Sequence, residues 1–434
     1  MASTYLTRTP SSAGNRDLWT WSGWIKRATL STNQKFFTCG NSSLTFMSIQ
    51  FNANDTLGFN DNSGGSTISN ITTNQVFRDV SAWYHIVAIY DSGNATSTDR
   101  LRLYVNGSRV TSLTDTTFPA PNTDGLVNST TVHNIGQRGD GNHYFDGEMS
   151  HVHFIDGTAY DASYFGETDA NGVWTIKTSP SVTYGTNGFF ILKDGNSVTD
   201  QSGNSNNFTV AGGTLTNTLD CPDNVFATMN PLDFHNNAPT LSNGNLTVAS
   251  SSSNSPIRAT MGFSKGKWYA EYRFEASDND NHIGCHSLET SLTLNYTGGE
   301  TYSWGLVTSS GDKRNNNVST SYGSAIGYSN SIVMIAIDKD NGKIWWGKDG
   351  TWFASGDPAN GTNEAFSNIN TVVGADGFVT FSDTTYRNGS WNFGNGYFGT
   401  TPVASAGTNA SGIGIFEYDV PTGYTALSTK GLNL

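Results

Sequence analysis

The sequence contains little cysteine and no long apolar run. Its 434 residues include three cysteines, Cys39, Cys221 and Cys285, which lie far apart. An odd and scattered set excludes a disulfide framework, and the lack of a Cys-x-x-Cys pair removes the usual sign of a zinc site. No apolar stretch approaches the roughly 18 residues that span a bilayer, and the first ten residues lack the apolar segment of a conventional signal peptide. We therefore expect no membrane insertion.

Charge is also scarce, and basic charge is the scarcer sign. Charged residues make up 14% of the chain, and the formal net charge is −13. This acidic excess disfavours phosphate backbones and anionic membrane surfaces as partners, so no nucleic-acid partner is expected. The sequence shows neither a convincing amphipathic helix nor a heptad repeat, which argues against a self-contained coiled-coil stalk.

Aromatic residues, in contrast, are abundant for so polar a chain. Hydrophobic residues reach only 35%, yet aromatics reach 12%, with 11 Trp, 18 Tyr and 24 Phe. A disordered chain of this polarity would lack these rings, whereas a few large side chains suit the thin core of a β-sandwich. The chain length predicts two domains of roughly 200 residues each.

Two hairpin patterns, one in each half of the chain, predict antiparallel β structure. Runs of β-branched and aromatic residues flank Asn106-Gly107 in the first half and Asn341-Gly342 in the second. An Asn-Gly pair readily supplies the two positive φ angles of a type I′ turn. The predicted fold class is all-β, with two antiparallel β-sandwich (jelly-roll) domains in tandem. We expect the first sandwich over 1–178, a connector rich in turn signals over 179–255, and the second sandwich over 256–434.

The stretch 267–275 alternates as expected of a half-buried strand. Its apolar side chains include Trp268 and Tyr272, and we expect this face to enter the core. The opposite face carries polar side chains and is expected to lie outside. Its members are Lys267, Glu271, Arg273 and Glu275.

Several motifs carry a resemblance to known families. Residues 17–178 resemble the laminin-G/concanavalin A-like lectin superfamily, through the segments 19–27, 83–91, 101–107 and 145–157. Residues 265–434 resemble SPRY-type sandwiches, through the segments 266–271, 334–342, 347–352 and 391–398. The combination of the two is similar to virion proteins of tailed phages. This resemblance implies a structural or adhesive role and names no ligand.

Catalysis is not expected. Laminarinase-type hydrolases of the lectin-like fold carry Glu-x-Asp-x-(x)-Glu on one strand, because glycoside hydrolysis needs two carboxylates facing each other across the sugar. This chain has no such run, and its few glutamates are scattered. Glu271 and Glu275 share a strand face, but Arg273 lies between them. A polysaccharide depolymerase with two converging carboxylates stays as an alternative.

No cofactor is expected, with calcium as the one ion to consider. Laminin-G-like domains often bind calcium at a sandwich rim through Asp, Asn and carbonyl oxygens. The candidate ligands here are Asp124, Asp140 and Asp146, with Asp156 as a further supplier. No spacing defines such a site, and Asp in turns commonly accepts hydrogen bonds from its own backbone.

Aromatic side chains are the candidate ligand-binding groups, because they stack on sugar faces while polar groups bond the hydroxyls. Trp24 faces away from Trp19 and Trp21, so we expect it on an open concave sheet. Trp345 and Trp346 point to opposite faces, so one of them is expected outside the main core. The candidates are Trp24, Tyr104, Trp345 and Trp352.

These observations and the resemblance together predict a virion protein of a tailed phage, such as a tail fibre, tip or head fibre. It is expected to bind host cell-surface polysaccharide or other virion proteins without catalysis. The alternative is a capsid decoration subunit with a purely structural role. A homo-oligomer is expected, and similar appendages are commonly trimers. The expected location is the virion surface, after assembly in the host cytoplasm.

Overall fold

The computed structural model describes residues 3–193, 197–249, 255–275, 280–293, 296–326, 330–386 and 388–434. Contacts divide the chain into two compact units. The first comprises Met1–Asn217 and Cys221–Asp223, and the second Thr218–Asp220 and Asn224–Leu434. Among the described residues the only α-helix is α1 (Ile369–Val373), and none is long and apolar enough to cross a membrane. The predicted all-β fold class is confirmed.

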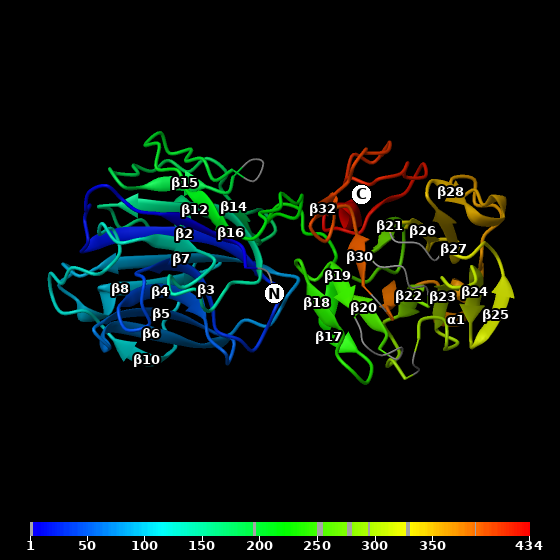
Figure 1. The fold of residues 1–434 in the computed structure, drawn as a ribbon, viewed down its shortest axis with the longest axis horizontal. Coiled ribbons are helices and arrows are strands. Elements are labelled where there is room, and N and C mark those ends of the chain that lie inside the picture. Colours follow the sequence, from blue (N-terminus) through cyan, green and yellow to red (C-terminus); the bar gives the residue numbers. More distant parts are fainter. Residues whose placement is uncertain are drawn as a thin grey trace. The chain divides into compact units, whose positions relative to one another are not determined.

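The first unit is a sandwich of two antiparallel sheets (Figure 1). One sheet has the order β10 (Leu113–Thr117), β6 (Ser66–Val76), β5 (Thr56–Ser63), β4 (Phe46–Phe51), β3 (Gln34–Cys39), β11 (His133–Ile135), β1 (Tyr5–Arg8) and β16 (Thr209–Gly212). The other has the order β15 (Phe189–Ile191), β12 (Gly147–Asp156), β2 (Leu18–Arg27), β7 (Trp83–Asp91), β8 (Leu101–Val105) and β9 (Ser108–Arg109). Trp19, Trp21 and Phe37 are among the rings that fill the space between them.

The second unit is a sandwich of the same kind. One sheet has the order β17 (Met229–Phe234), β20 (Ile257–Ala259), β29 (Val379–Thr384), β22 (His282–Ser287), β23 (Ser303–Val307), β24 (Asp312–Asn315) and β25 (Val318–Ser321). The other has the order β18 (Thr240–Ser242), β19 (Thr247–Ala249), β30 (Gly389–Asn392), β21 (Lys267–Phe274), β26 (Ile332–Asp338), β27 (Lys343–Lys348) and β28 (Thr351–Trp352). Short strand β33 (Thr425–Ala426) runs parallel to β21. Trp304, Trp346 and Trp391 lie in the core between the sheets.

The stretch expected as a connector, 179–255, contributes strands to both units. β15 pairs with β12 and β16 with β1 in the first unit, whereas β17 pairs with β20 in the second. Several of these strands span only three or four residues. So short a run shows no alternation in sequence, and its partners lie far along the chain.

The two Asn-Gly turns differ. Asn106 and Gly107 have φ angles of 46° and 81°, as a type I′ turn requires, and they join β8 to β9. At the second turn only Gly342 has a positive φ. Asp338 pairs with Lys343 there, so four residues connect β26 to β27. The hairpin prediction holds for both, but the second turn is longer than the pattern indicates.

The outer face of the β2–β7–β12 sheet is covered by the chain that follows β12. Val87 and Ile89 contact Ala162 and Phe165 there. Beside them, the ring of His85 lies nearly parallel to the rings of Trp24 and Trp174, with centroid distances of 4.9 Å and 5.9 Å. The indole N–H of Trp174 donates to Nδ1 of His85 at 3.1 Å, and the hydroxyl of Ser22 is hydrogen-bonded to Nε2 at 2.9 Å. Burial lowers the pKa of His85 to about 3.

This buried imidazole should make the first unit sensitive to acid. Because the folded state resists protonation of His85, its contribution to stability is lost as the pH falls from about 6.5 towards 3. His85→Phe keeps a ring in the stack and removes the titration. Between pH 7 and pH 4 the wild type should lose about 3 kcal/mol more of its unfolding free energy than the variant. Urea unfolding at the two pH values measures this difference.

Trp24→Phe is the matched control, since it changes the same stack without touching a titratable group. It should lower the unfolding free energy equally at both pH values. An identical pH dependence in the wild type and in His85→Phe would contradict the prediction.

Candidate functional site

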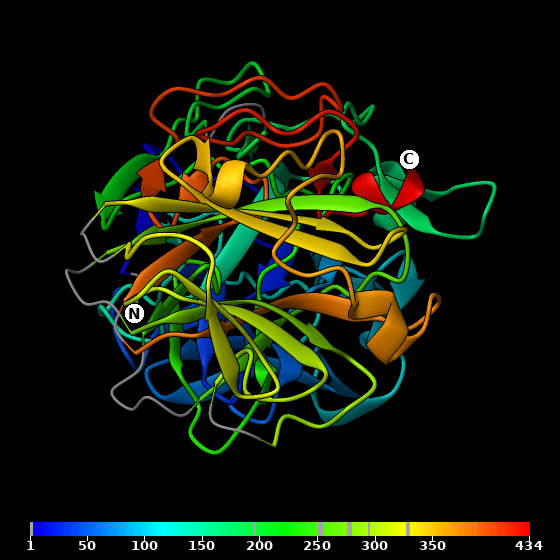
Figure 2. The same ribbon diagram turned by 90° about the vertical axis from the view of Figure 1, so that its right-hand side faces the viewer.

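The outer face of the β21–β26–β27 sheet in the second unit is covered by the C-terminal segment 397–427 (Figure 2). Phe416, Val420 and Tyr424 of this segment pack with Tyr269 and Trp345 of the sheet. Trp268 and Tyr272 enter the core between the sheets, as the alternation of 267–275 predicts. The opposite face of β21, however, does not lie outside. The second unit therefore has three layers where the sequence pattern predicts two.

Glu271 is a buried polar contact between this sheet and the C-terminal segment. Its Oε2 accepts a hydrogen bond from the backbone N–H of Glu417 at 2.8 Å, and its Oε1 from that of Tyr418 at 2.9 Å. The Tyr269 hydroxyl donates to Oε1 at 3.0 Å. Glu271 is 0% exposed, so the prediction that it points outside is wrong. Burial raises the pKa of Glu271 to about 7, although these donors oppose the shift.

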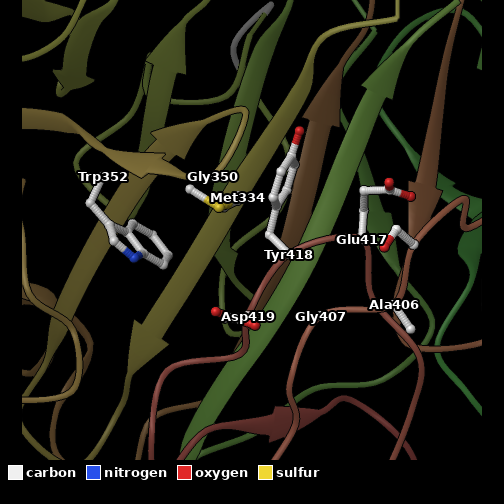
Figure 3. Close-up of a pocket in the computed structure, with 9 residues that line it drawn as sticks. Met334, Gly350, Trp352, Ala406, Gly407, Glu417, Tyr418 and Asp419 are labelled. Atoms are coloured by element: carbon white, nitrogen blue, oxygen red, sulfur yellow. The ribbon is translucent and has the colours of Figure 1, made fainter.

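A pocket of about 490 Å³ opens where the C-terminal segment meets the β27–β28 hairpin (Figure 3). The thioether of Met334 lies between the rings of Trp352 and Tyr418, which are both half-buried. Gly350 makes room for Tyr418, because a Cβ atom there would lie 3.1 Å from the ring. The remaining lining residues are Ser405, Ala406, Gly407, Glu417 and Asp419.

Two carboxylates line the pocket, and each is held by the loop around it. Glu417 accepts a hydrogen bond from the N–H of Ala404 at 2.7 Å. Oδ1 of Asp419 accepts from the N–H of Thr408 at 2.6 Å and from its hydroxyl at 2.9 Å. These bonds lower the pKa of Asp419, so it is ionised at neutral pH. The side chains are thus oriented before any ligand arrives.

The pocket offers stacking surfaces beside hydrogen-bond acceptors. Aromatic rings next to carboxylates are the groups with which proteins hold a sugar ring, one by its apolar face and the other by its hydroxyls. Each carboxylate already accepts a hydrogen bond from a loop N–H group, which holds it in place. This arrangement supports binding.

The four predicted ligand-binding residues do not come together. Trp24 and Tyr104 belong to the first unit, where Trp24 is 4% exposed and Tyr104 packs against the covered outer face of the sheet. Trp24 is therefore not on an open concave sheet. Trp345 and Trp346 enter different clusters, as expected, but Trp345 is 0% exposed beneath the C-terminal segment. Trp352 is the one candidate that lines the pocket.

The calcium candidates are also dispersed, and each has a local partner. Asp124 lies 3.6 Å from Arg16, Asp140 pairs with Arg138 at 2.6 Å, and Asp146 accepts from Thr29 at 2.6 Å. Among the described residues, no three His, Cys, Asp or Glu side chains form a group that could hold a metal. Asp156 faces N–H donors, including the side-chain amide of Asn128 at 2.6 Å. N–H donors stabilise a carboxylate but repel a cation, so the surroundings of Asp156 disfavour a metal ion.

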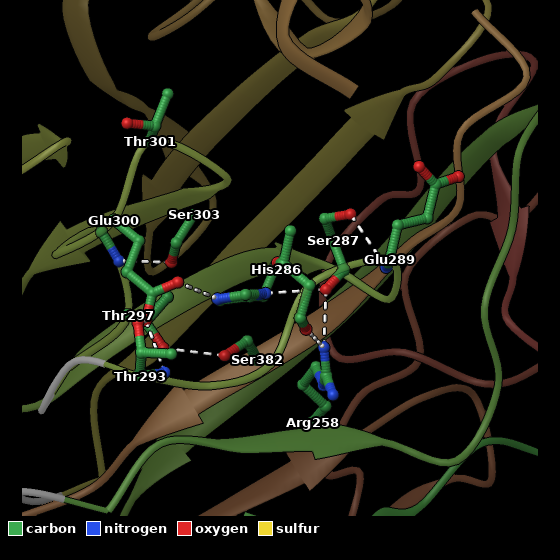
Figure 4. Close-up of polar contacts among 12 residues, drawn as sticks. Arg258, His286, Ser287, Glu289, Thr293, Thr297, Glu300, Thr301, Ser303 and Ser382 are labelled. Atoms are coloured by element: carbon green, nitrogen blue, oxygen red, sulfur yellow. Dashed lines mark hydrogen bonds and ion pairs between the residues drawn. The ribbon is translucent and has the colours of Figure 1, made fainter. Parts of the chain in front are cut away.

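A second polar cluster lies on the outer face of the β22–β23–β29 sheet (Figure 4). Nε2 of His286 lies 3.3 Å from Glu300, and the hydroxyls of Thr297 and Ser382 are 2.8 Å apart. Gly305 lets the loop lie directly on the sheet, since a Cβ atom there would be 2.5 Å from the carbonyl oxygen of Thr297. These groups bond one another, so the cluster closes a loop over the sheet.

Sequence reasoning did not find the acidic side of the pocket. Apolar and acidic residues alternate over 416–420. Phe416 and Val420 are buried, and Glu417, Tyr418 and Asp419 lie between them. This alternation was the available signal that the segment packs against a sheet. Which sheet it covers depends on β21 and β26, which lie roughly 80 to 150 residues earlier in the chain.

Comparison with known proteins agrees with the fold. Residues 2–162 match the family model of the concanavalin A-like lectin/glucanases superfamily, laminin G type. No curated protein sequence matches the chain significantly. The first unit therefore has a laminin-G/concanavalin A-like lectin fold, as its motifs predict.

Solved structures similar to this chain include the SPRY domain of human HERC1, with 13% identity, a TM-score of 0.30, and coverage of 38% of this chain and 96% of that one. A Bacteroides ovatus protein with a proposed role in carbohydrate binding has 18% identity and a TM-score of 0.30, with coverage of 51% and 62%. A heptameric pentraxin from Limulus polyphemus has 18% identity and a TM-score of 0.28, with coverage of 36% and 71%. SPRY domains are thus among the structural neighbours of the chain.

Glu271→Gln tests the contact between β21 and the C-terminal segment that lines the pocket. Because the folded protein holds the Glu271 proton more tightly than the unfolded chain, this group's contribution to stability is lost as the pH rises from about 4.5 to 7. The unfolding free energy of the wild type minus that of the variant should fall by about 3 kcal/mol over this window. Urea unfolding at the two pH values measures the difference.

The same variant should loosen the C-terminal segment. A glutamine amide group cannot accept hydrogen bonds on both of its terminal atoms, so backbone amide exchange at Glu417 and Tyr418 should be faster. Asp376→Asn, which removes an exposed carboxylate elsewhere in the unit, is the control and should leave both measurements unchanged. Unaltered exchange in Glu271→Gln would contradict a role of the Glu271 hydrogen bonds in holding the segment.

Proposed function

We propose that this chain is an adhesion protein of a tailed-phage virion, which binds host surface glycans through the pocket beside Trp352. The observation that carries this proposal is the pocket itself, in which Trp352 and Tyr418 stand next to Glu417 and Asp419. The lectin-like fold of the first unit supports carbohydrate binding as the general activity. The order of the two sandwiches, with the sequence motifs of each, is similar to virion proteins of tailed phages.

Binding in this pocket needs no cofactor. A sugar ring stacks on the indole of Trp352, and its hydroxyls donate to the carboxylates of Glu417 and Asp419. Because the loop bonds and Glu271 hold these groups in place, little side-chain freedom is lost on binding. Calcium, if it rigidifies a rim, would act away from this pocket, near Asp124, Asp140 or Asp146.

The proposed location is the virion surface, after assembly in the host cytoplasm. Other virion proteins are the second class of partner, and a homo-oligomer would present several copies of a weak site at once. Linked copies bind a repetitive polysaccharide far more tightly than one copy does. A capsid decoration role is the alternative, in which the pocket would serve contacts within the particle.

A glycan array probed with the full chain tests the binding activity. Polysaccharide ligands should be retained by the wild type, and Trp352→Ala should weaken the best of them about tenfold, because a stacked ring contributes on the order of 1 kcal/mol or more. Tyr302→Ala is the matched control, since Tyr302 is 40% exposed and directly precedes β23, a strand of the other sheet of the same unit. Incubation of the best ligand with the protein should release no new reducing ends. Equal binding by Trp352→Ala and wild type would contradict the assignment to this pocket.

Labelling of intact virions tests the proposed location. Gold-labelled antibody against residues 265–434 should decorate the tail tip or fibres of particles from a producing culture. Label spread over the head would favour the decoration role. Particles that bind no antibody, while the purified chain does, would contradict a place on the virion surface.

A further inference from the structure

The pocket beside Trp352 contains negative charge without any compensating cation. Among its described lining residues, Glu417 and Asp419 carry charge, and none is Lys, Arg or His. Glu271 lies directly behind the backbone of the same loop. Together with burial, the charges of Asp349, Glu417 and Glu271 raise the pKa of Tyr418. The Tyr418 hydroxyl therefore lies in a negative potential.

Each pocket carboxylate has one oxygen available to a ligand. Oε2 of Glu417 is bonded to Ala404, and Oδ1 of Asp419 is bonded to Thr408. Within the part of the chain that the structure describes, Oε1 of Glu417 and Oδ2 of Asp419 make no hydrogen bond. One oxygen thus fixes the side chain while the other stays free. A donor with positive charge makes the strongest bond to such an oxygen.

The aromatic walls favour the same kind of ligand. The faces of tryptophan and tyrosine rings attract cations, and the attraction is strongest for organic ammonium groups that shed water easily. A metal ion fits less well. Calcium needs six to eight oxygen ligands, whereas Trp352, Tyr418 and Met334 present carbon and sulfur.

We propose that the pocket selects glycans that carry a free, positively charged amino group, that is, amino sugars without an acetyl group on nitrogen. This inference rests on the proposed glycan binding and narrows its ligand class. The carboxylates of Glu417 and Asp419 and the rings of Trp352 and Tyr418 supply the contacts for the ammonium group. Anionic sugars are repelled by the same carboxylates. Neutral sugars offer these carboxylates only uncharged hydroxyl donors, which make weaker hydrogen bonds than an ammonium group does.

Calorimetric titration of the full chain with two matched probes tests the proposal. The probes are a glucosamine hexamer and its fully N-acetylated counterpart, both at pH 6. The amine form should bind at least about tenfold more tightly, the sum of one charged hydrogen bond and a cation–π contact. Raising NaCl from about 0.05 to 0.5 M should reduce this preference severalfold, because the interaction is one of charges.

Isosteric variants identify the groups responsible. Glu417→Gln and Asp419→Asn keep the loop contacts and remove one charge each, so each should lower the preference for the amine form severalfold. Binding of the N-acetylated hexamer should change little. Asp376→Asn removes an exposed charge outside the pocket, at a side chain 88% exposed, and should leave the preference unchanged. Circular dichroism verifies that all three variants are folded.

The possible results separate this inference from the proposed function. Equal binding of both hexamers, or binding of neutral array glycans alone, would overturn the amino-sugar selectivity and leave glycan binding intact. Retention of no carbohydrate of any kind would overturn both. A rise in melting temperature with about 1 mM calcium that Glu417→Gln and Asp419→Asn abolish would make the pocket a metal site and overturn the selectivity.

Discussion

The carboxylate of Glu271 is the contact on which the candidate site depends. It lies on the outer face of a central strand and accepts the backbone N–H groups of Glu417 and Tyr418. An uncovered carboxylate there would be solvated, and residues 417–418 of the C-terminal segment would lose their hydrogen bonds to this sheet. Because the two N–H groups are satisfied by one rigid side chain, the residues on either side point their side chains in defined directions. The pocket follows from that placement.

The same principle operates in the first unit, where a segment after β12 covers the outer face of a sheet. Trp24, His85 and Trp174 form an aromatic cluster there, and the neutral imidazole is held by hydrogen bonds to both ring nitrogens. Most of the tryptophans in this chain thus pack layers together. This use explains how a chain with only 35% hydrophobic residues has well-filled cores, because a few large rings supply most of the volume.

A consequence for function is that binding groups lie on loops and not on open sheets. In the second unit the pocket combines the β27–β28 hairpin with two stretches of the C-terminal segment. Loop sequences can vary while the sheets hold the loops in place, and many β-sandwiches present their ligand sites on such loops. The acidic character of the pocket also agrees with the acidic chain, but it is local, since it arises from two oriented carboxylates and a third behind them.

The sequence by itself determined the all-β class, the two hairpins and the core face of residues 267–275, since each depends on neighbouring residues with a period of two. Local motifs also predicted the lectin-like fold of the first half. Only the tertiary structure decided which aromatic residues are accessible. Trp24 and Trp345 sit on faces that alternation marks as outside, but segments distant in sequence cover them. Trp352 stays accessible, and Glu417 and Asp419 line the same pocket, because Glu271 anchors a loop about 145 residues further along the chain.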